Sequence, residues 1–191
     1  MKINIDRDKA INKVVEKRCF YLTQSDKLKI LEKIFPSLEE TDYIRELIKD
    51  GDLPNLDEKT INLIETKEYL KIPFSNSLKP IFLFELKEEL LGTTNEYLEL
   101  QLNNRENQFN VIGTIEKKGL CPCCRLYSIG FEEDGSHDIC SVCFWQNGGD
   151  GPNRITLDEA QNNFKLFGAM DKTFLQHIDS EGKIKYKKEH S

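Results

Sequence analysis

Four cysteines in the second half of the chain have the spacing of a metal site. Cys121 and Cys124 enclose two residues, as do Cys140 and Cys143, and fifteen residues separate the two pairs. Two thiolates three positions apart on a tight turn can reach one ion at about 2.3 Å. Four thiolates leave no open position on that ion, so the C-x2-C-x15-C-x2-C pattern predicts a structural Zn²⁺ site rather than a catalytic one.

Two further residues are alternative ligands. Cys121 and Cys123 leave little backbone between them for a turn, so we expect Cys123 to be a spare thiol beside Cys124. Arg125 occupies a position at which such turns often carry glycine in a left-handed conformation, and this departure keeps the choice between Cys123 and Cys124 open. His137 lies three residues before the second cysteine pair and could replace one thiolate, although four sulfurs already suffice.

The cysteines also allow other chemistry. A redox dithiol is the main alternative, with Cys123 resolving a sulfenic acid, but the usual cytosolic redox motif is a single Cys-x-x-Cys pair near a βαβ unit. Buried thiols at accidental spacing are disfavoured, because four cysteines rarely fall at these intervals by packing alone. Cys19 lies on the apolar stripe of a predicted helix and is expected in the core. Trp145 is expected to cover the metal site, with an exposed binding anchor as its alternative.

The first part of the chain is expected to be mostly helical. Apolar residues recur three and four positions apart over 11–22, 28–35 and 44–48, and another helix is expected from Asp57 to include Leu70. The residues placed to cap these helices are Asp6, Thr23 or Ser25, Ser37 with Glu40, and Asp57.

The middle of the chain is less sharply patterned. Residues 80–86 form a short apolar run that fits either a helix or a strand. A helix is favoured over 94–102, with Thr93 and Glu96 at capping-box spacing, although the leucines of this segment also alternate as in a strand. Residues 109–115 are predicted to form a strand that leads into the cysteines.

The segments around and after the cysteines complete the expected fold. A hairpin with its turn at 132–136 is predicted between the two pairs, and a helix with Thr156 and Glu159 in a capping box is predicted to end at Gly168. The basic residues of 183–188 are expected to be solvated. The predicted organisation is a helical region over 1–115, a zinc-binding module over 116–180, here called the CPCC module, and a basic tail over 181–191. The fold class is α+β, with the helical region packed on a small zinc-ribbon-like module that ends in a helix.

Composition limits the partners and the location. The chain of 191 residues has a net charge of −6 and a pI of about 5.3, whereas nucleic-acid affinity comes mostly from clustered lysine and arginine. We therefore do not expect nucleic acid as a partner. No apolar run approaches the roughly 18–20 residues that a membrane span needs, and the first six residues contain no apolar signal core. We expect a cytoplasmic protein without a membrane partner.

Three pieces of the sequence resemble the bacterial cysteine-rich CPCC family. They are Cys-Pro-Cys-Cys at 121–124, Ile-Cys-Ser-Val-Cys-Phe-Trp at 139–145, and residues 155–164 followed by Phe-Gly-Ala at 167–169. The resemblance covers roughly residues 119–170, and members usually carry glycine where Arg125 stands here. It implies a zinc-binding module more than an activity. Such proteins resemble the small antitoxic partners found beside bacterial polymorphic toxins, which implies a protein partner.

The sequence contains no recognisable catalytic motif. It lacks H-E-x-x-H, G-x-S-x-G, a phosphate loop and a dinucleotide fingerprint. We therefore expect a non-enzymatic binding protein, and the resemblance makes an immunity protein that neutralises a cognate toxin the leading hypothesis. The acidic charge suits a basic toxin such as a nuclease. The alternatives are a thiol redox enzyme that uses the CPCC cysteines and a zinc-ribbon nucleic-acid binder.

Overall fold

The computed structural model describes residues 2–35, 43–73, 75–130, 138–148 and 153–189. Its contacts divide the chain into two compact units, one of residues 8–90 and the other of residues 1–7 together with 91–191. The predicted α+β class is confirmed, because in the described part of the chain helices predominate and two small sheets have two strands each. The domain boundaries predicted at 115 and 180 stay predictions. Among the described residues, no helix is both long and apolar enough to cross a membrane.

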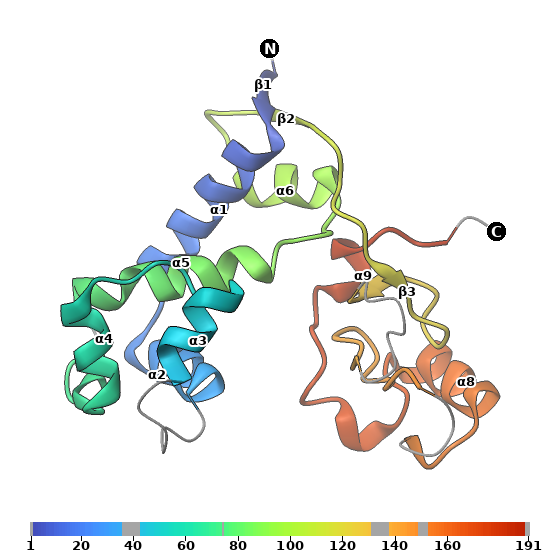
Figure 1. Ribbon diagram of the computed structural model, residues 1–191. Coiled ribbons are helices and arrows are strands. Elements are labelled where there is room, and N and C mark those ends of the chain that lie inside the picture. The colour runs from blue at the N-terminus through green and yellow to red at the C-terminus, as the bar shows by residue number, and fades with distance from the viewer. Residues whose placement is uncertain (1, 36–42, 74, 131–137, 149–152, 190–191) are drawn as a thin grey trace. The chain divides into compact units, whose positions relative to one another are not determined.

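The unit of residues 8–90 is built of helices (Figure 1). They are α1 (Arg7–Tyr21), α2 (Gln24–Ile34), α3 (Tyr43–Asp50), α4 (Glu58–Glu65) and α5 (Lys79–Glu88), with the 3-10 helices η1 (Glu68–Leu70) and η2 (Asn76–Leu78). The predicted stripe of α1 is confirmed, since Ile11, Val14, Val15 and Cys19 are all buried. The buried face of α1 is therefore the one that the three-and-four periodicity predicted, except that Leu22 lies beyond the end of the helix and is only partly buried.

Side chains at the expected positions begin two of these helices. Thr23 accepts a hydrogen bond from the Asp26 amide, and the Asp26 carboxylate accepts one from the Thr23 amide, which completes a capping box. Asp57 accepts from the Thr60 amide at 2.7 Å. Both caps satisfy amides that the first helical turn leaves without partners. The capping box predicted at Ser37 lies outside the described residues.

In this unit, the structure corrects one prediction and decides another that the sequence left open. The helix that starts at Asp57 ends at Glu65, and Lys67 then takes a left-handed φ of 56°, so Leu70 lies in η1 and is 47% exposed. Its predicted place on the buried stripe of α4 is wrong. Residues 80–86 form part of α5, where Ile81, Phe82 and Leu86 are buried. Burial of one face selects the helix that periodicity alone left open.

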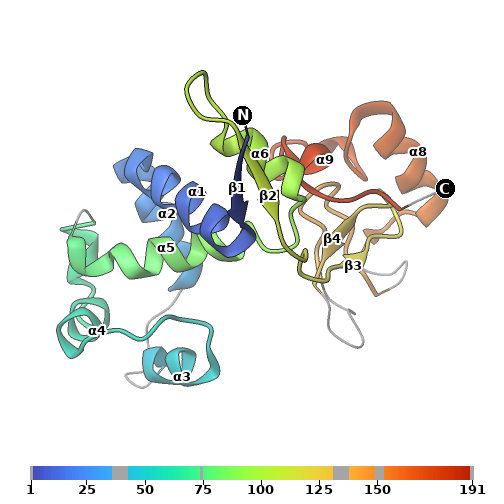
Figure 2. The ribbon, with the colours of Figure 1, turned by 90° about the horizontal axis from the view of Figure 1, so that it is seen from above.

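The second unit begins with a pair of strands distant in sequence. β1 (Ile3–Asp6) pairs in parallel with β2 (Phe109–Ile112), as seen from above in Figure 2. The strand predicted over 109–115 is confirmed for its first four residues, whereas β1 was not predicted. α6 (Asn95–Leu102) contacts β2, and its Glu99 carboxylate accepts from the Val111 amide at 2.9 Å. The favoured helix is confirmed, but Thr94 caps it in place of Thr93.

The remaining elements belong to the same unit. They are β3 (Gly119–Leu120), β4 (Tyr127–Ile129), α8 (Leu157–Phe167), the 3-10 helix η3 (Lys172–Phe174) and α9 (Gly182–Lys185). The predicted ends of α8 are confirmed, because Thr156 accepts from the Glu159 amide and Gly168 is left-handed with a φ of 94°. The turn predicted at 132–136 lies outside the described residues.

The basic segment near the C-terminus is partly packed rather than fully solvated. Lys185 is 7% exposed, and its ammonium pairs with the Asp179 carboxylate. Its carbonyl accepts a hydrogen bond from the Thr94 amide at 2.8 Å, and the Tyr97 hydroxyl donates to Glu181 at 2.7 Å. These contacts join α9 to α6, so the segment is a structural part of its unit.

A buried ion pair joins the start of α1 to the chain that enters the CPCC module. The Arg7 side chain is 3% exposed and donates to Glu116 from Nε at 3.0 Å and from Nη2 at 2.5 Å. Its Nη1 donates to Asn95 at 2.8 Å, and the Gly92 amide donates to Glu116 at 2.8 Å. Partial burial of Glu116 opposes ionisation, but the hydrogen bonds from Arg7 and Gly92 lower the pKa of its carboxyl to about 2.

Glu116→Gln is expected to lower the free energy of unfolding by about 3 kcal/mol at neutral pH, because the Arg7 guanidinium would stay buried without a charged partner. Urea unfolding followed by circular dichroism measures the change. Glu58→Gln is the matched control, since it removes the exposed partner of Arg45 and should leave the unfolding curve unchanged. Equal destabilisation by the two substitutions would contradict this role of Glu116.

Because the pKa of Glu116 is lowered, the stability difference between the wild type and Glu116→Gln should depend on pH. Its folded pKa of about 2 lies below the unfolded value, so its stabilisation is complete above about pH 4.5 and is lost as the pH falls towards 2. The difference in unfolding free energy between the wild type and Glu116→Gln should shrink over that range. Acid protonates the cysteines equally in both proteins, so a constant difference would argue against this assignment.

Candidate metal centre

Four sulfur atoms come together in the second unit. The Sγ atoms of Cys121, Cys124, Cys140 and Cys143 all lie within 4.8 Å of one another. The Sγ atoms of Cys121 and Cys143 are 3.5 Å apart, and those of Cys124 and Cys140 are 3.7 Å apart. Sulfurs that bind one ion tetrahedrally at about 2.3 Å are separated by about 3.8 Å. Each of these two contacts joins a cysteine of the first Cys-x-x-Cys pair to a cysteine of the second. None of the four cysteines is in a disulfide, so the set could hold a metal ion.

Short-range hydrogen bonds shape the turn that carries the first pair. The Arg125 amide donates to the Cys121 carbonyl at 2.9 Å, and the Cys121 amide donates to the Leu126 carbonyl at 2.9 Å. The antiparallel strands β3 and β4 flank this turn. The chain therefore reverses within the Cys-x-x-Cys segment and directs both sulfurs of the pair to the cluster.

The second pair lies on a turn of the same construction. The Phe144 amide donates to the Cys140 carbonyl at 2.8 Å, and the Cys140 amide donates to the Trp145 carbonyl at 2.9 Å. An isolated antiparallel bridge between Ile139 and Gln146 takes the place of the strands β3 and β4. The two turns are thus equivalent in hydrogen bonding, and each supplies two sulfurs.

Both turns place a residue other than glycine in the left-handed region. Arg125 has a φ of 59° and Phe144 a φ of 67°, and each residue directly follows the second cysteine of its pair. Such a conformation costs a residue with a Cβ atom roughly 1–2 kcal/mol. The turn therefore forms although residue 125 is not glycine. Cys124, and not Cys123, contributes the second sulfur of the first pair to the cluster.

Polar groups around Cys140 favour its ionised form. Its Sγ accepts from the Val142 amide at 3.4 Å, and the Ser128 hydroxyl of β4 lies 3.0 Å away. Ser128 is buried and lies 3.9 Å from the sulfur of Cys124 as well. Sequence reasoning missed Ser128, because a serine in a short strand carries no spacing signal. It is an outer-shell residue of the kind that orients metal ligands.

The four thiols cannot all ionise together without a cation. Hydrogen bonds from Cys121, Cys124 and Cys143 lower the pKa of Cys140, whereas hydrogen bonds with the neighbouring thiols raise the pKa values of Cys121 and Cys143. Burial adds to the cost of ionising the last two, because it disfavours the charged form. A bound cation relieves this conflict, since a coordinating thiol is deprotonated outright. The donor set therefore fits a metal ion that prefers sulfur.

Apolar residues enclose the cluster. Trp145 is 3% exposed and packs in a buried core with Val142, Ala160 and Met170. This is the predicted covering position, and burial leaves Trp145 little surface to act as an exposed anchor. The Met170 amide donates to the Cys143 carbonyl at 2.7 Å, which fixes the segment after α8 against the second turn.

The other candidate cysteines are not among the four clustered sulfurs, although Cys123 packs in the same buried core. Cys123 is buried, but its sulfur is not among the four. Cys19 lies in α1, in the helical unit, and is buried as predicted. His137 lies outside the described residues, so its role as an alternative ligand stays a prediction.

Adjacent cysteines offer a matched test of the site. Cys124→Ser is expected to reduce bound metal from about one ion per chain to a small fraction of that, because serine is a poor ligand for a metal that prefers sulfur. Cys123→Ser should retain the metal. Elemental mass spectrometry of the purified full chain measures both. Loss of metal from Cys123→Ser, with retention in Cys124→Ser, would contradict the ligand set.

A second pair of variants tests the left-handed turn. Arg125→Val should destabilise the metal-loaded protein by about 2 kcal/mol, because a β-branched residue fits this region poorly. Arg125→Gly should change its stability by less than about 1 kcal/mol, since relief of strain offsets the lost surface ion pair with Glu189. Chemical unfolding at constant metal concentration measures both. Equal stability of the two variants would show that the turn does not require a positive φ.

Comparison with known proteins gives a family match for the cysteine-containing segment. Neither the curated proteins nor the solved structures contain a match to the chain. A family model matches residues 119–183, from the start of β3 into α9, and this segment contains all four clustered sulfurs. The match supports the assignment of this segment to the family described as cysteine-rich CPCC.

Proposed function

We propose that the chain is a non-enzymatic binding protein whose CPCC module is held together by a structural Zn²⁺ ion. The observation that carries the proposal is the closed set of four buried sulfurs. Four protein ligands fill every position of a tetrahedral ion, whereas a catalytic zinc keeps one position for water or substrate. The metal would therefore act on stability and not on a substrate.

The composition of the module's core supports a structural metal. Of the described residues, eleven buried ones form this core, and five of them are cysteines. The other six are apolar, so metal binding would add to the folding free energy that their burial supplies. Zinc suits this role, because tetrahedral sites with four cysteines are typical structural zinc sites. Iron is the main competitor for four sulfurs, and elemental analysis separates the two.

The proposed partner is a cognate toxin that the protein neutralises by direct binding. The match to the cysteine-rich CPCC family supports this through the resemblance of such proteins to immunity partners. The net charge of −6 supports a basic toxin such as a nuclease, because opposite charges accelerate association. The helical unit would offer further surface for this partner.

Co-expression tests the immunity function. The wild-type chain, produced together with the toxin encoded beside its gene, should restore growth, and the purified proteins should bind in calorimetry. Cys123→Ser is the matched control and should protect as well as the wild type. Cys124→Ser should protect less, because its module lacks the metal. Continued killing despite good expression of the wild-type chain would remove the proposal.

The same preparations test the redox alternative. A thiol redox enzyme would reduce insulin disulfides and would lose this activity in Cys123→Ser. A structural zinc site predicts no such activity in the metal-loaded protein, because its four thiolates are bound to the ion. Catalytic insulin reduction by the metal-loaded wild type would favour the enzyme over the binding protein.

A further inference from the structure

A pocket of about 640 Å³ lies against the CPCC motif within the second unit. Among the residues that the structure describes, four basic side chains and no carboxylate line it: Arg125, Lys165, Lys183 and Lys188. They come from the first cysteine turn, from α8, from α9 and from the segment after α9. Such a concentration of positive charge is notable in a chain with a net charge of −6.

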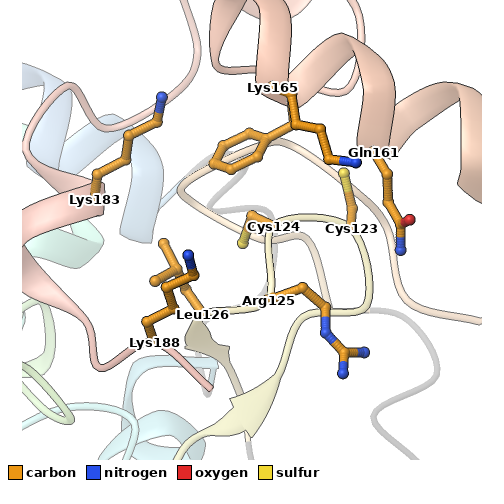
Figure 3. A pocket seen from close by; sticks show the side chains of 9 residues that line it. Cys123, Cys124, Arg125, Leu126, Gln161, Lys165, Lys183 and Lys188 are labelled. Carbon is orange, nitrogen blue, oxygen red and sulfur yellow. The ribbon is translucent and has the colours of Figure 1, made fainter. Parts of the chain in front are cut away.

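The four cations differ in what they already contact. Arg125 is paired with Glu189, and the ammonium of Lys183 lies 4.8 Å from the ring centroid of Phe164. Among the described residues, neither Lys165 nor Lys188 has an ion-pair partner. Figure 3 shows these two lysines reaching from different elements towards the adjacent cysteines of the motif, whereas the guanidinium of Arg125 points away. Two ammonium groups without an ion-pair partner in the described part of the chain are thus available to an anion in this pocket.

We propose that this pocket binds a small organic phosphate of about the size of a nucleotide. Lysine ammonium groups act as point charges and suit phosphate, whereas planar recognition of a carboxylate favours the fork of an arginine. Arg125, the one arginine among the described lining residues, is already paired with Glu189. The volume falls in the range of small-molecule sites. Leu126 and Phe164 add an apolar wall that can contact the organic part of the ligand. This binding goes beyond the proposed capture of a protein partner.

The basic side chains could instead stabilise the charge of the metal–thiolate cluster, and this role predicts a different effect of replacing them. Four thiolates on one divalent ion carry an excess of negative charge, and nearby lysines would stabilise it even if no ligand enters the pocket. Replacing the lysines would then weaken metal binding. An anion site predicts the opposite pattern, in which the metal stays bound and the affinity for the phosphate falls.

The test uses the full metal-loaded chain in isothermal titration calorimetry at low salt. ADP is the probe, inorganic pyrophosphate reports the phosphate part alone, and succinate reports a dicarboxylate. ADP is expected to bind with a dissociation constant below about 1 mM and to bind more weakly as salt screens the charges. Lys165→Gln and Lys188→Gln should each weaken binding roughly tenfold. Lys187→Gln, a neighbouring lysine that does not line the pocket, should change it less than about twofold.

Three results would overturn the proposal. The first is no binding of ADP or pyrophosphate, or equal binding of succinate. The second is that Lys165→Gln and Lys188→Gln lose metal, while the variant molecules that keep their metal bind ADP with unchanged affinity. This result would assign the lysines to the metal site. The third is binding of a single-stranded oligonucleotide of about ten nucleotides without binding of ADP, which would indicate a nucleic-acid surface instead.

Discussion

The gathering of four sulfurs from two turns is the constraint on which the C-terminal part of this protein depends. Each turn delivers two sulfurs by the same pair of backbone hydrogen bonds and the same left-handed residue, Arg125 in one turn and Phe144 in the other. Four buried thiols this close cannot share several negative charges unless a cation lies among them. One ion that bridges the turns would explain the left-handed backbone of both turns. It would also explain why two of the thiols have raised pKa values and why cysteines make up so much of the buried core.

Other contacts connect this cluster to the rest of its unit. The Met170 amide bonds to the second turn, and the Thr94 amide bonds to Lys185 of α9, which brings α6 to the C-terminal segment. Further along, the Arg7–Glu116 pair holds the chain between β2 and β3. Loss of the metal should therefore loosen more than the two turns, because the elements share one network of hydrogen bonds. The same packing assembles the basic residues of the pocket beside the CPCC motif.

Sequence predicted best what local chemistry determines. The cysteine spacing, the caps at Thr23 and Asp57 and the ends of α8 depend on residues a few positions apart. The pairing of β1 with β2 could not be predicted in the same way, because more than a hundred residues separate the partners. Ser128 and the pocket lysines likewise gain their meaning only from the fold, since a serine in a short strand and lysines in three separate segments show no common pattern.

In the proposed site, four cysteine sulfurs bind one structural metal ion. X-ray absorption at the metal edge of the native protein tests it most directly, because it reports the identity, number and distance of the ligand atoms. We expect zinc with four sulfur neighbours at about 2.3 Å and no nitrogen or oxygen neighbour. A first shell that contains nitrogen or oxygen, or a native protein without metal, would contradict it.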